Sequence, residues 1–162
     1  SIRAGNKEFK NILVMNSISK RSSAPGLRSG FIAGDKEILK EYMKYRTYIG
    51  CASPLPLQKA AAVAWNNESH VQVFRDIYKK NFEIARDLLG VKIPDATFYI
   101  WLEVENDLEF TKKLYEEKNV KVLPGSFLGR NGAGHGYVRI ALVENEEKTK
   151  EVLTRLKEFI NG

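Results

Sequence analysis

Short apolar runs mark the beginning of this chain and predict two strands separated by a loop. Residues 10–16 and 27–33 are apolar runs with polar ends, a pattern typical of buried strands. The loop, predicted at 17–26, contains serines, a proline and a glycine. Such strands need neighbours on both sides, and this chain is too short to supply them. We therefore predict that they belong to a larger buried sheet.

Helical patterns follow the second strand. Asp35 is a favourable N-cap for a helix over 36–48, which two prolines then end. An alanine-rich stretch predicts a second helix at 57–65, and a third helix is predicted over 68–89. The third helix carries an apolar stripe with spacings of three and four residues, which predicts one buried face. The stripe consists of Val71, Phe74, Tyr78, Phe82, Ala85 and Leu89.

The remaining residues predict a small sheet with helices packed against it, in the order β-α-β-β-α. Asn106 and Glu109 form a capping-box-like pair at the first of these helices, and Asn145 begins the last one. The five elements are predicted at residues 97–104, 106–118, 121–123, 136–143 and from 145 onward. The pattern as a whole is therefore of the α/β class.

Composition narrows the class of protein. The chain has 162 residues, of which 43% are hydrophobic and 28% charged, as in a soluble globular protein. No apolar run approaches the roughly 20 residues that a membrane span needs. Cys51 is the only cysteine, which excludes an internal disulfide and fits a cytoplasmic location. Because the chain does not begin with methionine, we expect a processed or partial product.

The net charge of +6 allows an anionic partner. One alternative is a non-catalytic basic module that binds nucleic acid. The basic residues, however, are interspersed with acidic ones, as at 112–117, which favours a solvated surface and no nucleic-acid partner. A small anionic ligand would need only two or three well-placed arginines. No set of histidine, cysteine and carboxylate residues has metal-ligand spacing, so no metal is expected.

The loop after the first strand carries the most informative chemistry. Lys20 lies at the exit of a predicted buried strand, and the nearby Arg21 and Arg28 would oppose its protonation and favour a nucleophilic amine. Arg28 offers a planar set of donors that suits a phosphate, and Ser17 and Ser19 offer hydroxyls. A nucleophilic amine beside a phosphate-binding group suggests pyridoxal phosphate as the cofactor.

The spacing of this segment resembles the lysine-attachment signature of class I and II aminotransferases. The matching residues are Ser17, Ile18, Ser19, Lys20, Gly26, Arg28 and Gly30. Ser29 departs from the pattern, which usually has a small aliphatic residue there. The resemblance implies that Lys20 holds the cofactor as a Schiff base and moves a proton during catalysis. It also implies that Arg28 and Ser17 hold the cofactor phosphate, whereas Ser19 could equally be an ordinary loop hydroxyl.

A second segment resembles the C-terminal signature of the same superfamily. It comprises Val122–Phe127 and, after a glycine-rich loop, Gly136–Leu142. The resemblance implies that Arg139 pairs with the carboxylate shared by amino-acid and 2-oxo-acid substrates. A structural ion pair is the alternative, since a charge within an apolar strand needs a partner. The loop between the two parts lacks the spacing of a phosphate loop, and we expect it near the substrate entrance, where His135 could touch substrate.

The resemblance covers essentially the whole chain but only the C-terminal part of such an enzyme. It implies the pyridoxal-phosphate-dependent transferase fold, with a remnant of the large cofactor-binding domain at 1–70 and a small α+β domain at 71–162. It also implies a homodimer, with Ser53 of the loop 50–58 at its interface. The groups that contact the pyridine nitrogen, the ring oxygen and the ring face lie upstream in the family, so we expect the 162-residue chain to be inactive alone.

Other enzymes of this fold share the lysine but break a different bond at Cα. A decarboxylase, a lyase or an acyl-condensing synthase therefore stays open as an alternative, although Arg139 together with the lysine signature favours transamination. Among transaminases, the run Ser19–Ser22 and the residues Pro25–Gly30 most resemble succinyldiaminopimelate and aspartate aminotransferases. Which amino acid is the substrate depends largely on residues outside this chain.

Overall fold

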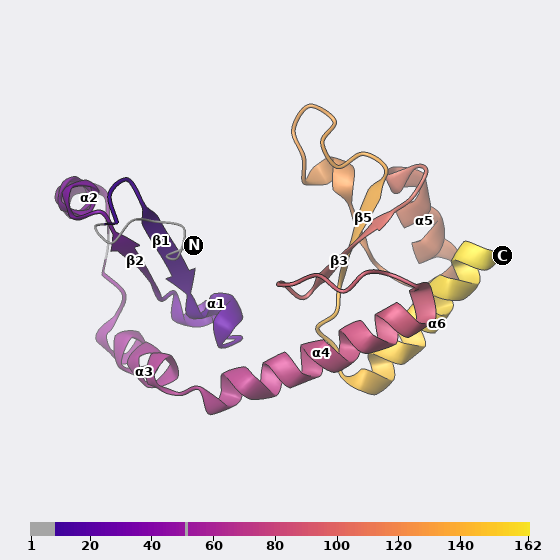
Figure 1. Cartoon of the computed structure of the whole chain (residues 1–162), viewed down its shortest axis with the longest axis horizontal. Helices are drawn as coiled ribbons and strands as arrows, with labels where there is room; N and C mark the ends of the chain where they lie inside the picture. Colours follow the sequence, from indigo (N-terminus) through magenta and orange to yellow (C-terminus); the bar gives the residue numbers. More distant parts are fainter. Residues whose placement is uncertain (1–8, 51) are drawn as a thin grey trace. The chain divides into compact units, whose positions relative to one another are not determined.

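The computed structural model describes residues 9–50 and 52–162. They fall into two compact units, unit 1 up to Gln72 and unit 2 from Val73 to Gly162, and the boundary lies within one long helix. Figure 1 labels the helices α1–α6 and the strands β1, β2, β3 and β5. None of the helices in the described residues is long and apolar enough to cross a membrane.

Unit 1 begins with an antiparallel hairpin of β1 (Leu13–Ser17) and β2 (Gly30–Gly34). These are the two predicted strands, but they are not buried: Met15 is 72% exposed and Phe31 46%. Within this chain the strands are exposed, and their burial in a larger sheet stays a prediction. They are exposed because, among the described residues, each strand pairs only with the other.

The segment predicted as a loop between these strands is more ordered than expected. It contains a one-turn helix, α1 (Ile18–Arg21), and a short 3₁₀ helix, η2 (Pro25–Leu27). The side chain of Ser17 caps α1, and Pro25 has the φ angle that suits the first position of a helix. Serine and proline thus begin helical turns here, whereas their pattern in the sequence predicts an irregular loop.

Helices α2 (Lys36–Ile49) and α3 (Leu55–Asn66) complete unit 1 and agree with the predicted ranges within two residues. Asp35 caps α2 as predicted, because its carboxylate accepts the backbone N–H groups of Glu37 and Ile38 at 2.9 and 3.3 Å. It also accepts the N–H of Asn11 at 2.7 Å. These bonds, that from Asn11 first, lower the pKa of the Asp35 carboxyl below 3.8. Cys51 lies outside the described residues.

Unit 2 begins within one long helix. After this helix, its elements follow in the predicted β-α-β-β-α order. Its three strands form an antiparallel sheet in the order β3-β5-β4. The elements are α4 (Ser69–Leu89), β3 (Tyr99–Glu103), α5 (Asp107–Lys118), β4 (Leu123–Pro124), the 3₁₀ helix η3 (Gly125–Phe127), β5 (Tyr137–Ala141) and α6 (Glu146–Asn161).

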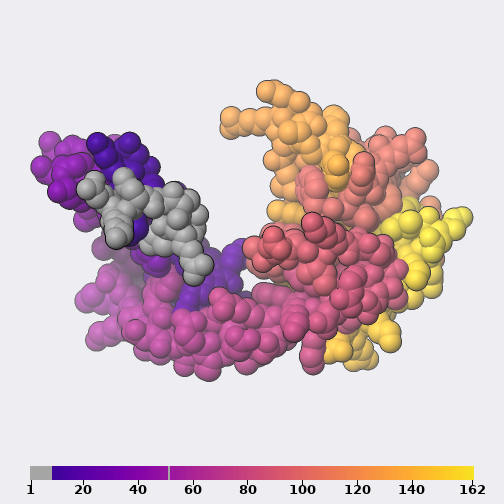
Figure 2. All heavy atoms as spheres, in the orientation of Figure 1, coloured from indigo at the N-terminus to yellow at the C-terminus, as the bar shows by residue number. Residues whose placement is uncertain are grey.

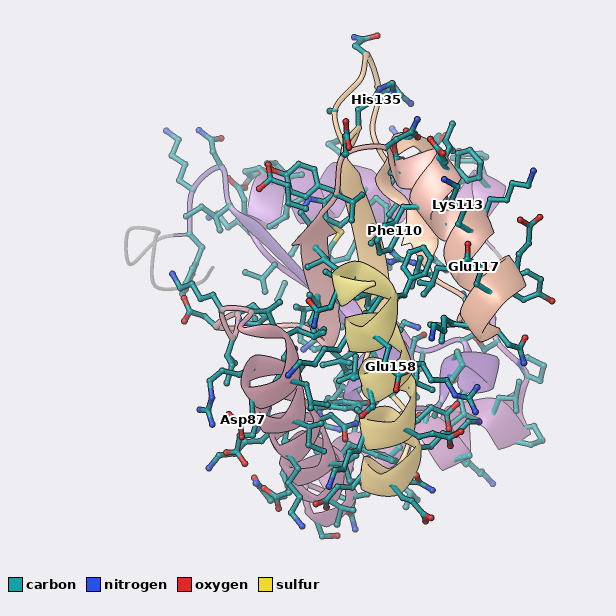
Figure 3. All side chains as sticks on the ribbon, turned by 90° about the vertical axis from the view of Figure 1, so that its right-hand side faces the viewer. Asp87, Phe110, Lys113, Glu117, His135 and Glu158 are labelled. Atoms are coloured by element: carbon teal, nitrogen blue, oxygen red, sulfur yellow. The ribbon has the colours of Figure 1, made fainter. Side chains whose placement is uncertain are left out.

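Residues of β5 alternate between the core of unit 2 and the opposite face of the sheet. Val138 and Ile140 are buried, whereas Tyr137 and Arg139 are only partly buried. Side chains from α4, α5 and α6 complete the core, which consists of Phe82, Ala85, Ile100, Leu114, Val120, Val122, Val138, Ile140, Leu142, Leu153 and Leu156. At the edge of this core, Phe110 of α5 points toward α6, where its ring meets Phe159 at 5.2 Å (Figure 3). The helices therefore cover one face of the sheet and leave Arg139 on the other.

Candidate active site

The candidate lysine lies on the one-turn helix at the end of β1. Ser17 fixes the start of this turn, because its Oγ accepts the N–H of Ser19 at 3.1 Å and lies 2.9 Å from the Ser19 hydroxyl. Ile18 is fully buried beneath the turn. Lys20 is exposed on it. The turn therefore presents one amine and two hydroxyls from adjacent positions.

The candidate phosphate-binding arginine lies at the end of η2, just before β2, and is linked to the lysine turn. Arg28 has a left-handed backbone (φ 48°), and its Nη1 donates to the carbonyl of Pro25 at 2.7 Å. The carbonyl of the next residue, Ser29, accepts the Ser17 hydroxyl and the Ile18 N–H, both at 3.2 Å. The structure therefore joins the lysine turn to the arginine turn through Ser29.

A network around Trp65 was missed by the sequence analysis. The indole Nε1–H of Trp65 donates to the Ser29 hydroxyl at 3.0 Å. Arg21, which follows the lysine, forms an ion pair with Glu68, and its guanidinium carbon lies 5.3 Å from the centre of a Trp65 ring. Ser29 and Trp65 are 36 residues apart, so no local pattern could have indicated the pair. The tryptophan therefore contacts Arg21 and Ser29, the residues that follow Lys20 and Arg28.

Arg139 lies in unit 2 on the open face of the sheet, held by aromatic rings. Its guanidinium carbon is 4.3 Å from the centre of the Tyr99 ring. Across the strands it is paired with Trp101, whose ring stacks on Tyr137 with centroids 5.4 Å apart. Among the described residues, no carboxylate forms an ion pair with Arg139. A guanidinium presented in this way can bind an anionic group from outside the chain.

The loop before Arg139 is tied down at both ends by a buried carboxylate. Asp107, at the start of α5, is 4% exposed. It accepts the N–H of Ser126 at 2.8 Å and the N–H of Gly136 at 3.4 Å. Ser126, through its side chain and then its backbone N–H, lowers the pKa of the Asp107 carboxyl below 3.8. No local sequence pattern indicates Asp107, because its partners lie 19 and 29 residues away.

Between these two tied ends, the loop projects from unit 2. Figure 2 shows it in orange, and Figure 3 places His135 on it. The loop folds back on itself, so that a Cβ atom at Gly125 would lie 2.1 Å from the carbonyl oxygen of Gly134. This position therefore requires glycine because the two backbone segments approach closely, and not because the chain must bend freely there.

Similarity to known proteins places the chain in a family. The profile described as "Aminotransferase class I and II" matches residues 1–156. The chain therefore belongs to the class I and II aminotransferase family, which depends on pyridoxal phosphate.

Individual relatives agree with this assignment. Over 155 residues the chain is 31% identical to the LL-diaminopimelate aminotransferase of Natranaerobius thermophilus, covering 90% of the chain and 40% of that protein. It is 30% identical over 160 residues to the aspartate aminotransferase of Thermotoga maritima, covering 95% and 41%. The crystal structure of aminotransferase AspB from Helicobacter pylori superposes with a TM-score of 0.94 at 42% identity, covering 99% of this chain and 43% of that one.

The chain spans about two fifths of the length of the curated relatives that it matches. The predicted family and the predicted fold, a part of the pyridoxal-phosphate-dependent transferase fold, are both confirmed. The donor set in unit 1 also fits the cofactor, because a phosphate-bearing aldehyde needs an amine, hydroxyls and a guanidinium near one another. The roles of the individual residues stay predictions.

Proposed function

We propose that this chain supplies the lysine and the substrate-carboxylate arginine of a pyridoxal-phosphate-dependent aminotransferase. Lys20 would hold the cofactor, with Ser17, Ser19 and Arg28 around its phosphate, and Arg139 would bind the substrate. The enzyme would exchange an amino group between an amino acid and a 2-oxo acid. The observation that carries this proposal is Arg139, a partly buried guanidinium over an aromatic ring with no carboxylate partner among the described residues.

The residues of unit 1 suit the roles given to them. Lys20 is exposed on a capped turn, a position that suits covalent attachment and the movement of a proton at the substrate Cα. Arg28 donates one N–H to Pro25, which leaves further donors of its planar guanidinium for phosphate. The bound cofactor would supply a ring that withdraws electrons from the substrate Cα.

Arg139 favours transamination over the alternatives. An aminotransferase binds two substrates in turn, and both carry the same carboxylate, so a fixed guanidinium serves both half-reactions. Its position over Tyr99 restricts its orientation before substrate arrives. A decarboxylase would instead lose this carboxylate, and a basic nucleic-acid module would have no need of one isolated arginine on an aromatic face.

The relatives suggest a substrate class and a setting. Two of them are named aspartate aminotransferase and LL-diaminopimelate aminotransferase, so we propose an amino acid with a second carboxylate and a role in biosynthesis. We also propose a cytoplasmic homodimer, with Ser53 near the interface. The 162-residue chain alone would have no transaminase activity, and measurable turnover by the purified chain would contradict this part.

Replacement of Lys20 tests the cofactor site. In the complete protein that carries this chain, Lys20→Ala should abolish the absorbance of lysine-bound pyridoxal phosphate and also transamination. Lys36→Ala is the matched control, because its side chain is 91% exposed and pairs with Glu37, which is also exposed. An unchanged cofactor spectrum in Lys20→Ala would refute the assignment.

Replacement of Arg139 tests the substrate site. Arg139→Gln should raise KM for both the amino acid and the 2-oxo acid by about 100-fold, since the loss of one partner from a charge pair costs about 2–5 kcal/mol. The cofactor spectrum should not change. A rise in KM for only one of the two substrates would contradict the role of a shared carboxylate site.

A further inference from the structure

We propose that Trp65 is a positioning residue that joins the Lys20 turn to the Arg28 turn and so sets how tightly the cofactor phosphate is held. This inference rests on the proposed function. Trp65 lies at the end of α3. It acts on Arg21 and Ser29, which directly follow the two candidate residues.

Ser29 joins Trp65 to the lysine turn. Its hydroxyl accepts the Trp65 indole N–H at 3.0 Å, while its carbonyl accepts the Ser17 hydroxyl and the Ile18 N–H, both at 3.2 Å. Ser29 is thus bonded on one side to α3 and on the other to the start of the lysine turn. A change at Trp65 releases one of the anchors of the residue directly after Arg28.

Arg28 needs such an anchor because of its backbone. Its φ angle of 48° lies in the left-handed region, which a residue with a side chain adopts only when its surroundings hold it there. Within its own turn, the support comes from Pro25, whose carbonyl accepts the Arg28 N–H at 3.4 Å and its Nη1 at 2.7 Å. The Trp65–Ser29 bond supplies an anchor from outside the turn.

Arg21, at the end of the lysine turn, also contacts Trp65. Its guanidinium lies 5.3 Å from the centre of a Trp65 ring and donates to the carbonyls of Ala64 at 3.0 Å and Trp65 at 3.4 Å. These carbonyls belong to the last turn of α3, where a positive charge is favourable. The ion pair with Glu68 adds to this contact. The end of α3 therefore holds both turns at once.

Phosphate recognition is the property that separates positioning from general stability. Pyridoxal has the same aldehyde as pyridoxal phosphate but no phosphate. If Trp65 acts by placing the Arg28 turn, its loss should weaken binding of the phosphorylated cofactor and leave pyridoxal binding nearly unchanged. If Trp65 only stabilises unit 1, both ligands should weaken together.

The test measures the Kd of both ligands for the complete protein by absorbance. Trp65→Phe keeps a ring but removes the indole N–H, and Ser29→Ala removes its acceptor. Each should raise the Kd of pyridoxal phosphate by about 10-fold and that of pyridoxal by less than about 2-fold, as for the loss of one hydrogen bond. Ser29→Thr should restore the wild-type ratio, because it keeps the hydroxyl.

Two further comparisons complete the test. The double variant should be no weaker than either single variant, because both remove the same bond. Tyr48→Phe, at a side chain on α2 that is largely exposed, is the control and should leave both Kd values unchanged. Circular dichroism of each variant checks folding, and Ser29→Ala carries the test if Trp65→Phe does not fold.

The outcomes separate this inference from the proposed function. A wild-type protein that binds pyridoxal phosphate no more tightly than pyridoxal would overturn the proposed phosphate site and, with it, the role of Trp65. A wild-type preference for the phosphate that persists in Trp65→Phe and Ser29→Ala would overturn the role of Trp65 alone. Equal weakening of both ligands would also overturn it.

Discussion

Unit 2 has an extended apolar core, whereas unit 1 is held together largely by polar contacts. The core of unit 2 contains side chains from the helices α4, α5 and α6 and from the strands β3 and β5. Among the described residues of unit 1, the buried apolar side chains are Ile18, Ala61 and Val71. Several large apolar side chains of unit 1 are instead exposed, including Met15, Met43, Tyr48, Ile49, Leu55 and Val63.

The difference changes how each candidate site residue is kept in place. Arg139 lies on a strand whose other face, with Val138 and Ile140, packs into the core. Lys20 and Arg28 depend instead on individual hydrogen bonds at Ser17, Ser29 and neighbouring residues. A single lost hydrogen bond should therefore disturb the site in unit 1 more than a comparable loss on the sheet of unit 2.

The largest expected effect comes from replacing one leucine by alanine in each unit, which removes the same side-chain atoms from both. Leu156→Ala, at a fully buried position of α6, should reduce the free energy of unfolding by about 2–5 kcal/mol. Leu55→Ala, at a position that is 70% exposed on α3, should change it by less than about 0.5 kcal/mol. Urea unfolding followed by circular dichroism measures both. An equal cost at Leu55 would show that its side chain is covered in solution.

The same contrast explains how well the sequence predicted the fold. In unit 2, apolar periodicity and capping residues agree with the tertiary core, as at Asn106, whose side chain accepts the Glu109 N–H as predicted. The Glu109 side chain does not complete a capping box, since it pairs with Lys113 four residues further on. In unit 1, apolar runs also predicted strands, but their burial requires neighbours that these residues do not provide.

The candidate site was predictable only where its signal is local. Lys20, Arg28 and Arg139 were identified from short segments that resemble family signatures. Trp65 and Asp107 were not, because each acts through partners far along the chain, Ser29 in one case and Ser126 with Gly136 in the other. When the fold brings distant partners to a positioning residue, the sequence next to that residue carries no recognisable pattern.

A medium effect is expected from two asparagines in different settings. Asn81 is fully buried in α4, and its Nδ2 donates to the carbonyls of Leu142 at 3.1 Å and Glu144 at 2.8 Å. Asn81→Ala should lower the free energy of unfolding by about 1–3 kcal/mol, because it removes the donor from a buried carbonyl. Asn66→Ala on α3 removes an exposed bond to the carbonyl of Ala62 and should cost less than about 0.5 kcal/mol. If urea unfolding shows the same loss of unfolding free energy for both variants, the contrast between the two asparagines is wrong.

The smallest effect concerns one carboxylate in each unit and depends on pH. Asp35 and Asp107 both have a pKa below the ordinary 3.8, so folding favours their charged forms. Their contribution to stability is therefore fully present above about pH 4 and is lost as the pH falls through the lowered pKa of each. Asp107→Asn and Asp35→Asn should each flatten part of the dependence of stability on pH.

The two carboxylates can be followed separately, because each accepts a backbone N–H from elsewhere in its own unit. The amide of Asn11 reports on Asp35, and the amide of Ser126 reports on Asp107. In an NMR titration, both amide signals should shift with midpoints below 3.8, and each shift should vanish only in the matching Asn variant. A midpoint at or above 3.8 for Ser126 would mean that the charged Asp107 does not hold the loop before Arg139. That loop would then be positioned by the core of unit 2 and the close packing of Gly125 with Gly134, without help from a polar contact.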